Sequence, residues 1–273
     1  SDVYKRQFGY SLLPEGGVCF RLWAPGAEDV QLCLISEGKK RFFSVMKGMT
    51  GGWFQQENKA AAAGDLYQFL IDGDLLVPDP ASRFQPDDIH GPSQIISAAG
   101  FDWQNDSWKG RPWEEVILYE LHVGTFSPEG TFAGVEARLD YLADLGVTAI
   151  ELMPVADFPG KFNWGYDGAL IFAPDSIYGH PDDLRSLVRT AHRKGLMVFL
   201  DVVYNHFGPE GNYLHVYARE AFFQEDIHTP WGAAINFSGP GSRTVRDFFI
   251  HNALYWLEEF QLDGLRFDAV HGI

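Results

Sequence analysis

The chain has 273 residues, of which 46% are hydrophobic and 21% charged, which is enough apolar material for two folded domains and too much for a disordered protein. Its 37 acidic and 21 basic residues give a formal net charge of −16, which disfavours polyanionic partners such as nucleic acid or an acidic membrane surface. A neutral ligand such as a sugar is not repelled by this charge, and the aromatic content of 15% suits stacking on sugar rings.

No stretch approaches the roughly 20 apolar residues of a membrane span, and no signal-peptide pattern opens the chain, so a cytoplasmic protein is expected. The 2 cysteines, Cys19 and Cys33, lie in apolar runs. Two cysteines cannot form a disulfide scaffold, and their spacing is not that of a metal site, so both are predicted to be buried in the core. Residues 1–7 show no pattern and are left out of the predicted fold.

Residues 8–98 contain short segments of alternating polarity separated by turn residues. Their period of two is typical of strands, and no helical period runs between them. Strands at this spacing predict a β-sandwich domain. A stretch rich in proline and aspartate at 78–92 has no period and is expected to be a linker or a docking loop. The predicted strands cover residues 18–23, 30–35, 42–45, 53–56 and 67–71.

After a linker at 99–113, residues 114–273 alternate between apolar strand segments and amphipathic helices. This alternation predicts parallel βαβ units, either in a doubly wound sheet or in a (β/α) barrel. No glycine-rich phosphate-binding motif follows any strand, which favours the barrel. Strands are predicted at 116–122, 147–153, 196–203 and 264–270, and helices at about 135–145, 181–195 and 242–260.

Polar and ionisable side chains gather where three of these strands end. In both parallel architectures ligands bind at the carboxyl ends of the strands, so these residues are predicted to form a site. A single Asp or His in such a place is more often structural, and the prediction rests on the whole set. The set is His122 after the first strand, Asp201, Asn205 and His206 after the third, and Arg266, Asp268 and His271 after the fourth.

Asp268 is the strongest candidate for a reacting group. Strand alternation places Arg266 and Asp268 on one face, where the guanidinium would lower the pKa of the carboxyl group and orient it. An ionised, oriented carboxylate is what a retaining glycosidase uses as its nucleophile. Asp201 is predicted to accept a hydrogen bond from Arg266, and His206 to bind a sugar hydroxyl. The alternative is an Arg–Asp pair that only fastens the end of the strand.

Two aromatic segments complete the predicted site. Between the second strand and the second helix, Tyr166 offers a flat face for a pyranose ring and Gly165 allows a close approach of the backbone. Core packing of Trp164 and Tyr166 is the equally weighted alternative. The loop at 207–241, which carries Trp231 and Phe237, is long for a compact domain and is expected to act as a lid or wall of the site.

Four segments, in their order along the chain, resemble the α-amylase family of retaining glycoside hydrolases. They are residues 151–154 (Glu-Leu-Met-Pro), 164–167 (Trp-Gly-Tyr-Asp), 201–206 (Asp-Val-Val-Tyr-Asn-His) and 264–268 (Gly-Leu-Arg-Phe-Asp). Within the family, residues 78–86, 119–126, 207–213 and 228–232 are most similar to its trehalose-releasing members. The resemblance runs from about residue 8 to the last residue. It implies an immunoglobulin-like sandwich followed by a (β/α)8 barrel, here truncated after about its fourth strand.

The same resemblance implies roles for the site residues. Asp268 would be the nucleophile and Arg266 its orienting partner. The implied reaction releases trehalose by hydrolysing the α-1,4 bond beside it in maltooligosyl trehalose or a related α-glucan. No metal, no organic cofactor, no nucleic acid and no membrane are implied. Substrate-binding roles would fall to Asp201, Asn205, His206, Tyr166, His271 and His122.

The chain departs from the family pattern in one respect. The general acid and the stabilising Asp of the family would both lie beyond Ile273, and Glu210, Glu220 and Glu225 do not follow a strand as the acid should. Retaining hydrolysis needs two carboxyl groups about 5 Å apart. The chain alone is therefore expected to be inactive, and its open sheet edges are expected to make it prone to aggregate. The alternatives are a glycogen branching or debranching enzyme and a non-catalytic carbohydrate-binding protein.

Overall fold

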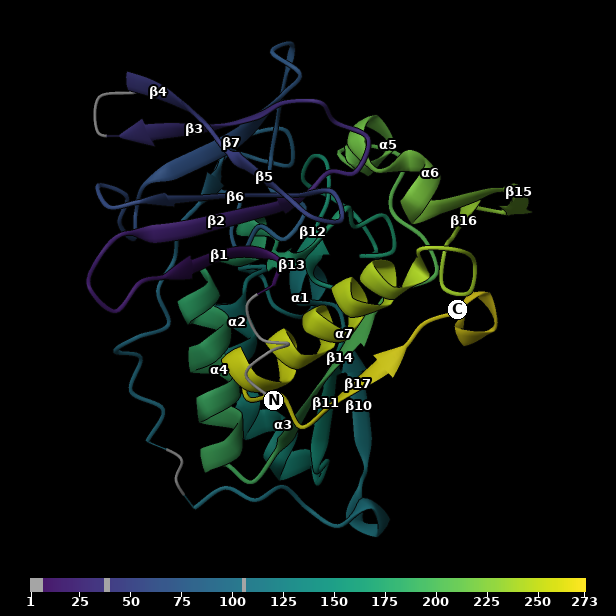
Figure 1. The fold of residues 1–273 in the computed structure, drawn as a ribbon. Helices are drawn as coiled ribbons and strands as arrows, with labels where there is room; N and C mark the ends of the chain where they lie inside the picture. Colours follow the sequence, from purple (N-terminus) through teal and green to yellow (C-terminus); the bar gives the residue numbers. More distant parts are fainter. Residues whose placement is uncertain (1–6, 37–39, 105–106) are drawn as a thin grey trace.

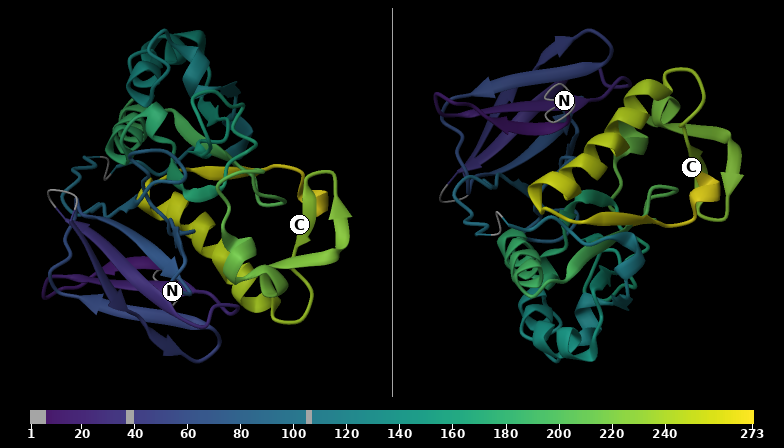
Figure 2. Two further views of the ribbon diagram at one scale, coloured as in Figure 1. Left: turned by 90° about the horizontal axis from the view of Figure 1, so that it is seen from above. Right: turned by 90° about the horizontal axis from the view of Figure 1, so that it is seen from below.

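A computed structural model of the chain describes residues 7–36, 40–104 and 107–273. It contains an N-terminal β-sandwich and a second unit built on a parallel sheet, with the long helix α7 (Ser242–Glu259) between them (Figure 1). The same arrangement is seen from above and from below in Figure 2. Of the residues left out of the predicted fold, 1–6 lie outside the described residues. None of the described helices has the length and apolarity needed to cross a lipid bilayer.

Two antiparallel sheets form the sandwich and confirm its prediction. Their strand orders are β1–β2–β6–β5 and β4–β3–β7–β8, with β9 paired to β7. Fully buried aromatic rings, among them Phe20 and Tyr67 at 4.9 Å, fill the space between the sheets. Cys19 and Cys33 are free and buried, as predicted. The strands are β1 (Gly9–Leu12), β2 (Val18–Trp23), β3 (Val30–Ser36), β4 (Lys40–Val45), β5 (Lys47–Met49), β6 (Trp53–Asn58), β7 (Leu66–Ile71), β8 (Leu75–Val77) and β9 (Ser93–Gln94).

The stretch at 78–92 is a docking loop and not a free linker. Asp79 is fully buried and accepts a hydrogen bond of 2.6 Å from the hydroxyl group of Tyr67. Burial raises the pKa of Asp79 to about 6, although the bond from Tyr67 acts in the opposite direction. The guanidinium of Arg83 lies 5.8 Å from the ring centre of Tyr255 on α7. The loop therefore connects the sandwich to the helix that lies beside the parallel sheet.

Four parallel strands form the sheet that carries the candidate site. Their order is β10–β11–β14–β17, which is the order of the first four strands of a barrel. The predicted sandwich followed by part of a barrel is thus confirmed. Within the described part of the chain, β10 and β17 are the open edges of this sheet. The bounds are β10 (Leu118–Leu121), β11 (Ala149–Leu152), β14 (Met197–Val202) and β17 (Gly264–Phe267).

The helices begin and end largely where local signals predict. Helix α4 (Pro181–Arg193) starts at a capping box formed by His180 and Asp183, with proline in its first turn. The single helix predicted at about 135–145 is wrong. It is two helices, α2 (Phe132–Glu136) and α3 (Leu139–Leu145), because the backbone leaves the helical region at Arg138, where φ is −109° and ψ is 6°.

Several short elements escaped prediction. The hairpin of β12 (Ala156–Asp157) and β13 (Leu170–Pro174) lies between β11 and α4. The uninterrupted loop expected at 207–241 is wrong, because it contains two one-turn helices and a hairpin. The strand predicted to reach residue 270 ends at Phe267. Most of these elements have two to five residues, form through tertiary contacts and leave little periodicity in the sequence. The remaining elements are α1 (Val123–Phe126), α5 (Leu214–Tyr217), α6 (Arg219–Phe222), β15 (Phe223–Thr229), β16 (Gly232–Ile235), and the 3-10 turns η1 (Trp113–Glu115), η2 (Ser176–Tyr178) and η3 (Val270–Gly272).

Candidate active site

Asp268 lies directly after β17, at the carboxyl end of the parallel strands. Its backbone N–H donates to the carbonyl oxygen of Val202 on β14 at 3.0 Å, which continues the sheet by one residue. Ala269 then adopts a left-handed conformation with φ of 42°, and the chain turns away from the sheet. The side chain of Asp268 is 22% exposed. The carboxylate is therefore held at the end of the sheet and stays accessible to a ligand.

One nitrogen of Arg266 contacts two carboxylates. Nη1 donates to Oδ1 and Oδ2 of Asp201 at 3.0 and 2.8 Å, and to Oδ1 of Asp268 at 2.8 Å. The register pairs Asp201 with Arg266, so the parallel ladder itself creates the first contact. The bonds to Asp201 raise the pKa of Arg266, which stays charged. The predicted contacts of Arg266 with both aspartates are confirmed, whereas the catalytic roles remain predictions.

Asp201 is buried, and its oxygens are already occupied. Besides the bonds from Arg266, Oδ2 accepts a hydrogen bond of 2.9 Å from the hydroxyl group of Tyr166. Burial raises the pKa of Asp201, and the bonds from Arg266 and Tyr166 lower it. Burial and the bond to Asp201 raise the pKa of the Tyr166 phenol, which therefore acts as a donor. This arrangement makes Asp201 a group that positions its neighbours.

A tight turn between β12 and β13 presents Tyr166 to the site. Oδ1 of Asn163 accepts a hydrogen bond of 2.8 Å from the backbone of Gly165. Gly165 has φ of 100°, and a Cβ there would collide with the carbonyl oxygen of Pro154, so no other residue fits. The side chain of Trp164 is 74% exposed, which excludes core packing for this residue. Tyr166 is half-buried, with its hydroxyl group fixed at Asp201.

His206 lies beside this turn. Its Nε2 atom is 2.9 Å from the carbonyl oxygen of Tyr166 and donates to it. The ring of Trp231 stacks on His206 with centroids 5.1 Å apart, so this part of the long segment does reach the site. Phe237 packs instead against Phe249 of α7, which removes it from the predicted wall. Burial lowers the pKa of His206, which favours the neutral ring.

In the part of the chain that the structure describes, the other three predicted binding residues form no side-chain hydrogen bond with Asp201, Arg266 or Asp268. His122 lies after β10, and its Nε2 atom donates to the carbonyl oxygen of Asn163 at 2.8 Å, which supports the turn that carries Tyr166. Asn205 is buried, and neither polar atom of its amide has a hydrogen-bond partner among the described residues. His271 is exposed on η3, with no hydrogen bond to another described residue. The structure thus brings Asp201, Arg266, Asp268, Tyr166 and His206 together and leaves His271 apart.

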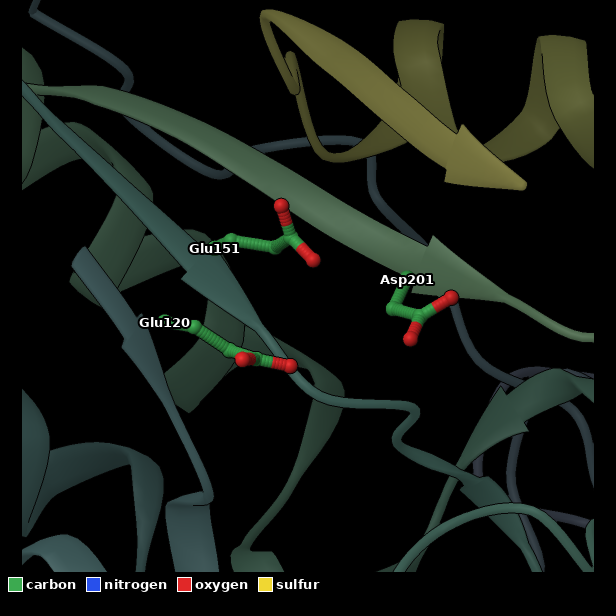
Figure 3. A group of neighbouring side chains, drawn as sticks. All are labelled: Glu120, Glu151 and Asp201. Carbon is green, nitrogen blue, oxygen red and sulfur yellow. The ribbon is translucent and has the colours of Figure 1, made fainter. Parts of the chain in front are cut away.

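Two acidic residues next to this group were missed from the sequence. One carboxylate oxygen from each of Glu120, Glu151 and Asp201 lies within 4.8 Å of the other two, on one face of the sheet (Figure 3). Burial raises the pKa of Glu151, and the charges of Asp201 and Glu120 raise it further. Carboxylates are ligands for hard cations, but a proton held by Glu151 relieves the same repulsion. An acidic residue inside each of two apolar strands was the signal that could have found them.

Two family models match parts of the chain. The model described as the catalytic domain of alpha amylase matches residues 94–253, more than half of the chain. The chain belongs to the α-amylase family. A second model, carbohydrate-binding module 48 (isoamylase N-terminal domain), matches residues 7–81, which include all strands of the sandwich except β9. The resemblance predicted from the four strand-end segments is thereby confirmed.

Curated relatives match almost the whole of this α-amylase family chain. Malto-oligosyltrehalose trehalohydrolase of Saccharolobus solfataricus is 47% identical over 97% of the chain, and that of Deinococcus radiodurans is 43% identical over 97%. A 1,4-alpha-glucan branching enzyme of Burkholderia thailandensis is 33% identical over 98%. The matches cover 46%, 42% and 35% of these relatives, so the chain spans less than half of their length.

Solved structures share the fold. The crystal structure of a protein described as an alpha amylase from Salmonella typhimurium has a TM-score of 0.92 and 47% identity, and covers 98% of this chain and 44% of its own. A pullulanase from Anoxybacillus, solved with maltotetraose, has a TM-score of 0.84 and 25% identity, with coverages of 97% and 46%. The sandwich followed by the parallel sheet is therefore an arrangement found in other members of the family.

Proposed function

We propose that this chain supplies the nucleophile side of a retaining α-glucan hydrolase that cuts the α-1,4 bond beside trehalose in maltooligosyl trehalose. The observation that carries the proposal is the contact of Arg266 with Asp268, which orients a partly exposed carboxylate at the open end of the sheet. The choice of substrate is supported by the relatives named trehalohydrolases, which match nearly the whole chain.

In the proposed reaction, a carboxylate oxygen of Asp268 attacks the anomeric carbon of the glucose unit next to trehalose. The glycosidic C–O bond breaks, the leaving oxygen takes a proton from a general acid, and water later hydrolyses the glycosyl ester. The ring of Tyr166 offers an apolar face to the glucose, because its hydroxyl group is fixed on Asp201. His206 lies at the same edge, and its buried Nδ1 atom, which has no hydrogen-bond partner among the described residues, is the ring nitrogen left for a sugar hydroxyl.

We propose that none of the acidic residues near the site or in the segment 207–241 serves as the general acid. The oxygens of Asp201 are occupied, and Glu151 lies within β11, opposite Phe199, two residues before the level of Asp201. In the long segment, Glu210 bonds His90 and Glu225 pairs with Arg219. We therefore propose that the second carboxyl group comes from the part of the relatives that this chain does not cover, and that the chain alone is inactive.

The proposal is tested by product analysis. A longer protein should release free trehalose from maltooligosyl trehalose if it contains these 273 residues followed by a segment that corresponds to the rest of the relatives' length. Asp268→Asn in that protein should abolish the release, while the 273-residue chain should release none. Trehalose release by the chain alone, or an unaffected Asp268→Asn variant, would contradict the proposal.

A branching or debranching activity is the second candidate, favoured by the match to a branching enzyme and to a pullulanase. With maltooligosyl trehalose, a branching activity predicts new α-1,6 bonds, and a debranching activity predicts no product, since this substrate has no α-1,6 bond. Neither activity releases free trehalose. A non-catalytic carbohydrate-binding protein is the third. It predicts that Asp268→Ala leaves glucan affinity unchanged and that no product forms with any substrate.

A further inference from the structure

The docking loop at 78–92 meets the segment that follows His206, and this contact has no part in the proposed reaction. Nδ1 of His90, in the docking loop, lies 2.8 Å from the hydroxyl oxygen of Tyr213. Nε2 of the same ring lies 2.9 Å from Oε1 of Glu210, which is 120 residues away in the sequence. A phenol, an imidazole and a carboxylate thus lie in a row where the two segments meet.

The carboxylate determines which nitrogen of the imidazole ring holds the proton. A carboxylate oxygen only accepts hydrogen bonds, so Nε2 of His90 donates to Glu210. In the neutral ring Nδ1 is then the acceptor, and the hydroxyl group of Tyr213 donates its proton to it. The order is that of a nucleophile, a base and a group that orients the base, and both distances are short enough for proton transfer.

Buried contacts beneath these three side chains hold the two segments together. Ile89, next to His90, is fully buried. Gly211, next to Glu210, has φ of 86°, and a Cβ there would lie 2.4 Å from side-chain carbons of Ile89. The two backbones can approach so closely only because residue 211 has no side chain. His90 and Glu210 are therefore brought together by the packing beneath them and not by their mutual attraction alone.

Solvent reaches this group of side chains. The side chains of His90 and Glu210 are 50% and 60% exposed, and Tyr213 is half-buried, so a reagent in solution has access to them. Tyr141 on α3 offers a comparison. It is 60% exposed, and its hydroxyl group has no hydrogen-bond partner among the described residues. Exposure alone therefore favours Tyr141 as the more reactive phenol, whereas a neighbouring base favours Tyr213.

We propose that Tyr213 is a site of covalent modification by activated acyl donors, the class that includes acyl phosphates and thioesters, with His90 as the base. Oη of Tyr213 attacks the carbonyl carbon, and the leaving group departs with the electron pair of its bond to that carbon. The phenolic proton passes to Nδ1 of His90 and from there to the leaving group. The tyrosyl ester has no proton to donate, so acylation removes one of the two bonds of His90 to the segment 207–213. The proposal does not depend on the reaction at Asp268.

The test is acetylation of the 273-residue chain by N-acetylimidazole, with the modified peptides quantified over time by mass spectrometry. Tyr213 should react about tenfold faster than Tyr141, because a general base increases the nucleophilicity of the phenol. His90→Gln can still bond the hydroxyl group but is not a base, so it should lower the rate at Tyr213 about tenfold and leave Tyr141 unchanged. Glu210→Gln, which keeps a hydrogen-bond acceptor without the charge, should lower the rate at Tyr213 by less.

Hydroxylamine should remove the acetyl group from Tyr213, since it cleaves phenolic esters and leaves amides intact. Tyr141 is the internal control in each sample, because a variant that alters the fold as a whole changes its rate as well. A rate at Tyr213 equal to or below that at Tyr141 would overturn the proposal, and so would an unchanged rate at Tyr213 in His90→Gln. Acetylation found only on groups that resist hydroxylamine would also reject an ester at Tyr213.

Discussion

Nη1 of Arg266 lies 2.8 Å from Oδ1 of Asp268, and this bond holds the carboxylate on the same side of the strand as the guanidinium. Because the same nitrogen also bonds the buried Asp201, the loss of Arg266 removes the charged partner of a carboxylate that water does not reach.

We expect Arg266→Ala to lower the free energy of unfolding of the chain by about 2 kcal/mol, because an uncompensated buried charge is left at Asp201. Arg266→Lys keeps the charge without the planar guanidinium and should cost less. Urea unfolding followed by circular dichroism measures both. Arg219→Ala, which breaks the exposed pair with Glu225, is the control and should cost at most about 0.5 kcal/mol. Equal losses for Arg266→Ala and Arg219→Ala would contradict the buried role of Asp201.

We expect the turn before Tyr166 to tolerate no side chain at Gly165 without a loss of stability. Gly165→Ala should destabilise the chain by about 3 kcal/mol, since it meets both an unfavourable φ and the carbonyl oxygen of Pro154. Gly160→Ala is a matched control in the same loop, with φ of 85° and no atom within 4 Å of the added Cβ. It should cost only about 1 kcal/mol. Thermal unfolding of the two variants compares them, and similar melting temperatures would show that the turn yields to the added methyl group.

The stability of the fold should depend on the pH through Asp157. This residue is buried on β12, and burial, reinforced by Asp175 and Asp88, raises its pKa to about 9. In the unfolded chain an aspartate has a pKa of about 3.9. The folded state therefore favours the protonated form, and the stabilisation it contributes is complete below the unfolded pKa and lost as the pH rises towards 9.

Asp157→Asn removes this dependence, because the amide resembles the neutral acid and cannot ionise. At pH 8 the variant should exceed the parent chain by more than about 1 kcal/mol in free energy of unfolding, and the advantage should shrink towards pH 4. Urea midpoints across this range give the measurement. Asp144→Asn, on the exposed surface, should follow the parent chain at every pH. A constant difference between Asp157→Asn and the parent chain would reject the titration.

The open edges of the parallel sheet predict self-association. Leu118 on β10 is 45% exposed and Phe267 on β17 is 43% exposed, and both lie on unpaired edge strands of the described sheet. The apparent molecular mass from light scattering should rise with protein concentration, and Leu118→Lys should reduce this rise because a charge on an edge opposes pairing. Phe42→Lys places the same charge on the edge strand β4 of the sandwich. If only Phe42→Lys reduces the scattering, the sandwich edge is responsible and the prediction is wrong.

Local pattern was sufficient for the larger elements. The alternation in residues 18–23 predicted β2, and the spacing of apolar residues predicted α7. Both elements are buried more extensively than the one-sided pattern indicates, since β2 has only one residue that is not buried and α7 lies between the two units. Capping signals predicted α4. The short elements of the segment 207–241 could not be found in this way, because one turn of helix has no period to detect.

The residues of the candidate site were identifiable one by one from their positions at strand ends, since a parallel sheet exposes those ends wherever it forms. Which of them meet was settled only by the register that sets Asp201 opposite Arg266 and by the turn that carries Tyr166 to the same carboxylate. The proximity of the acidic residues Glu120 and Glu151 to Asp201 was likewise visible only in the tertiary structure. Contacts between strands far apart in the chain depend on distances in space, and no local periodicity encodes them.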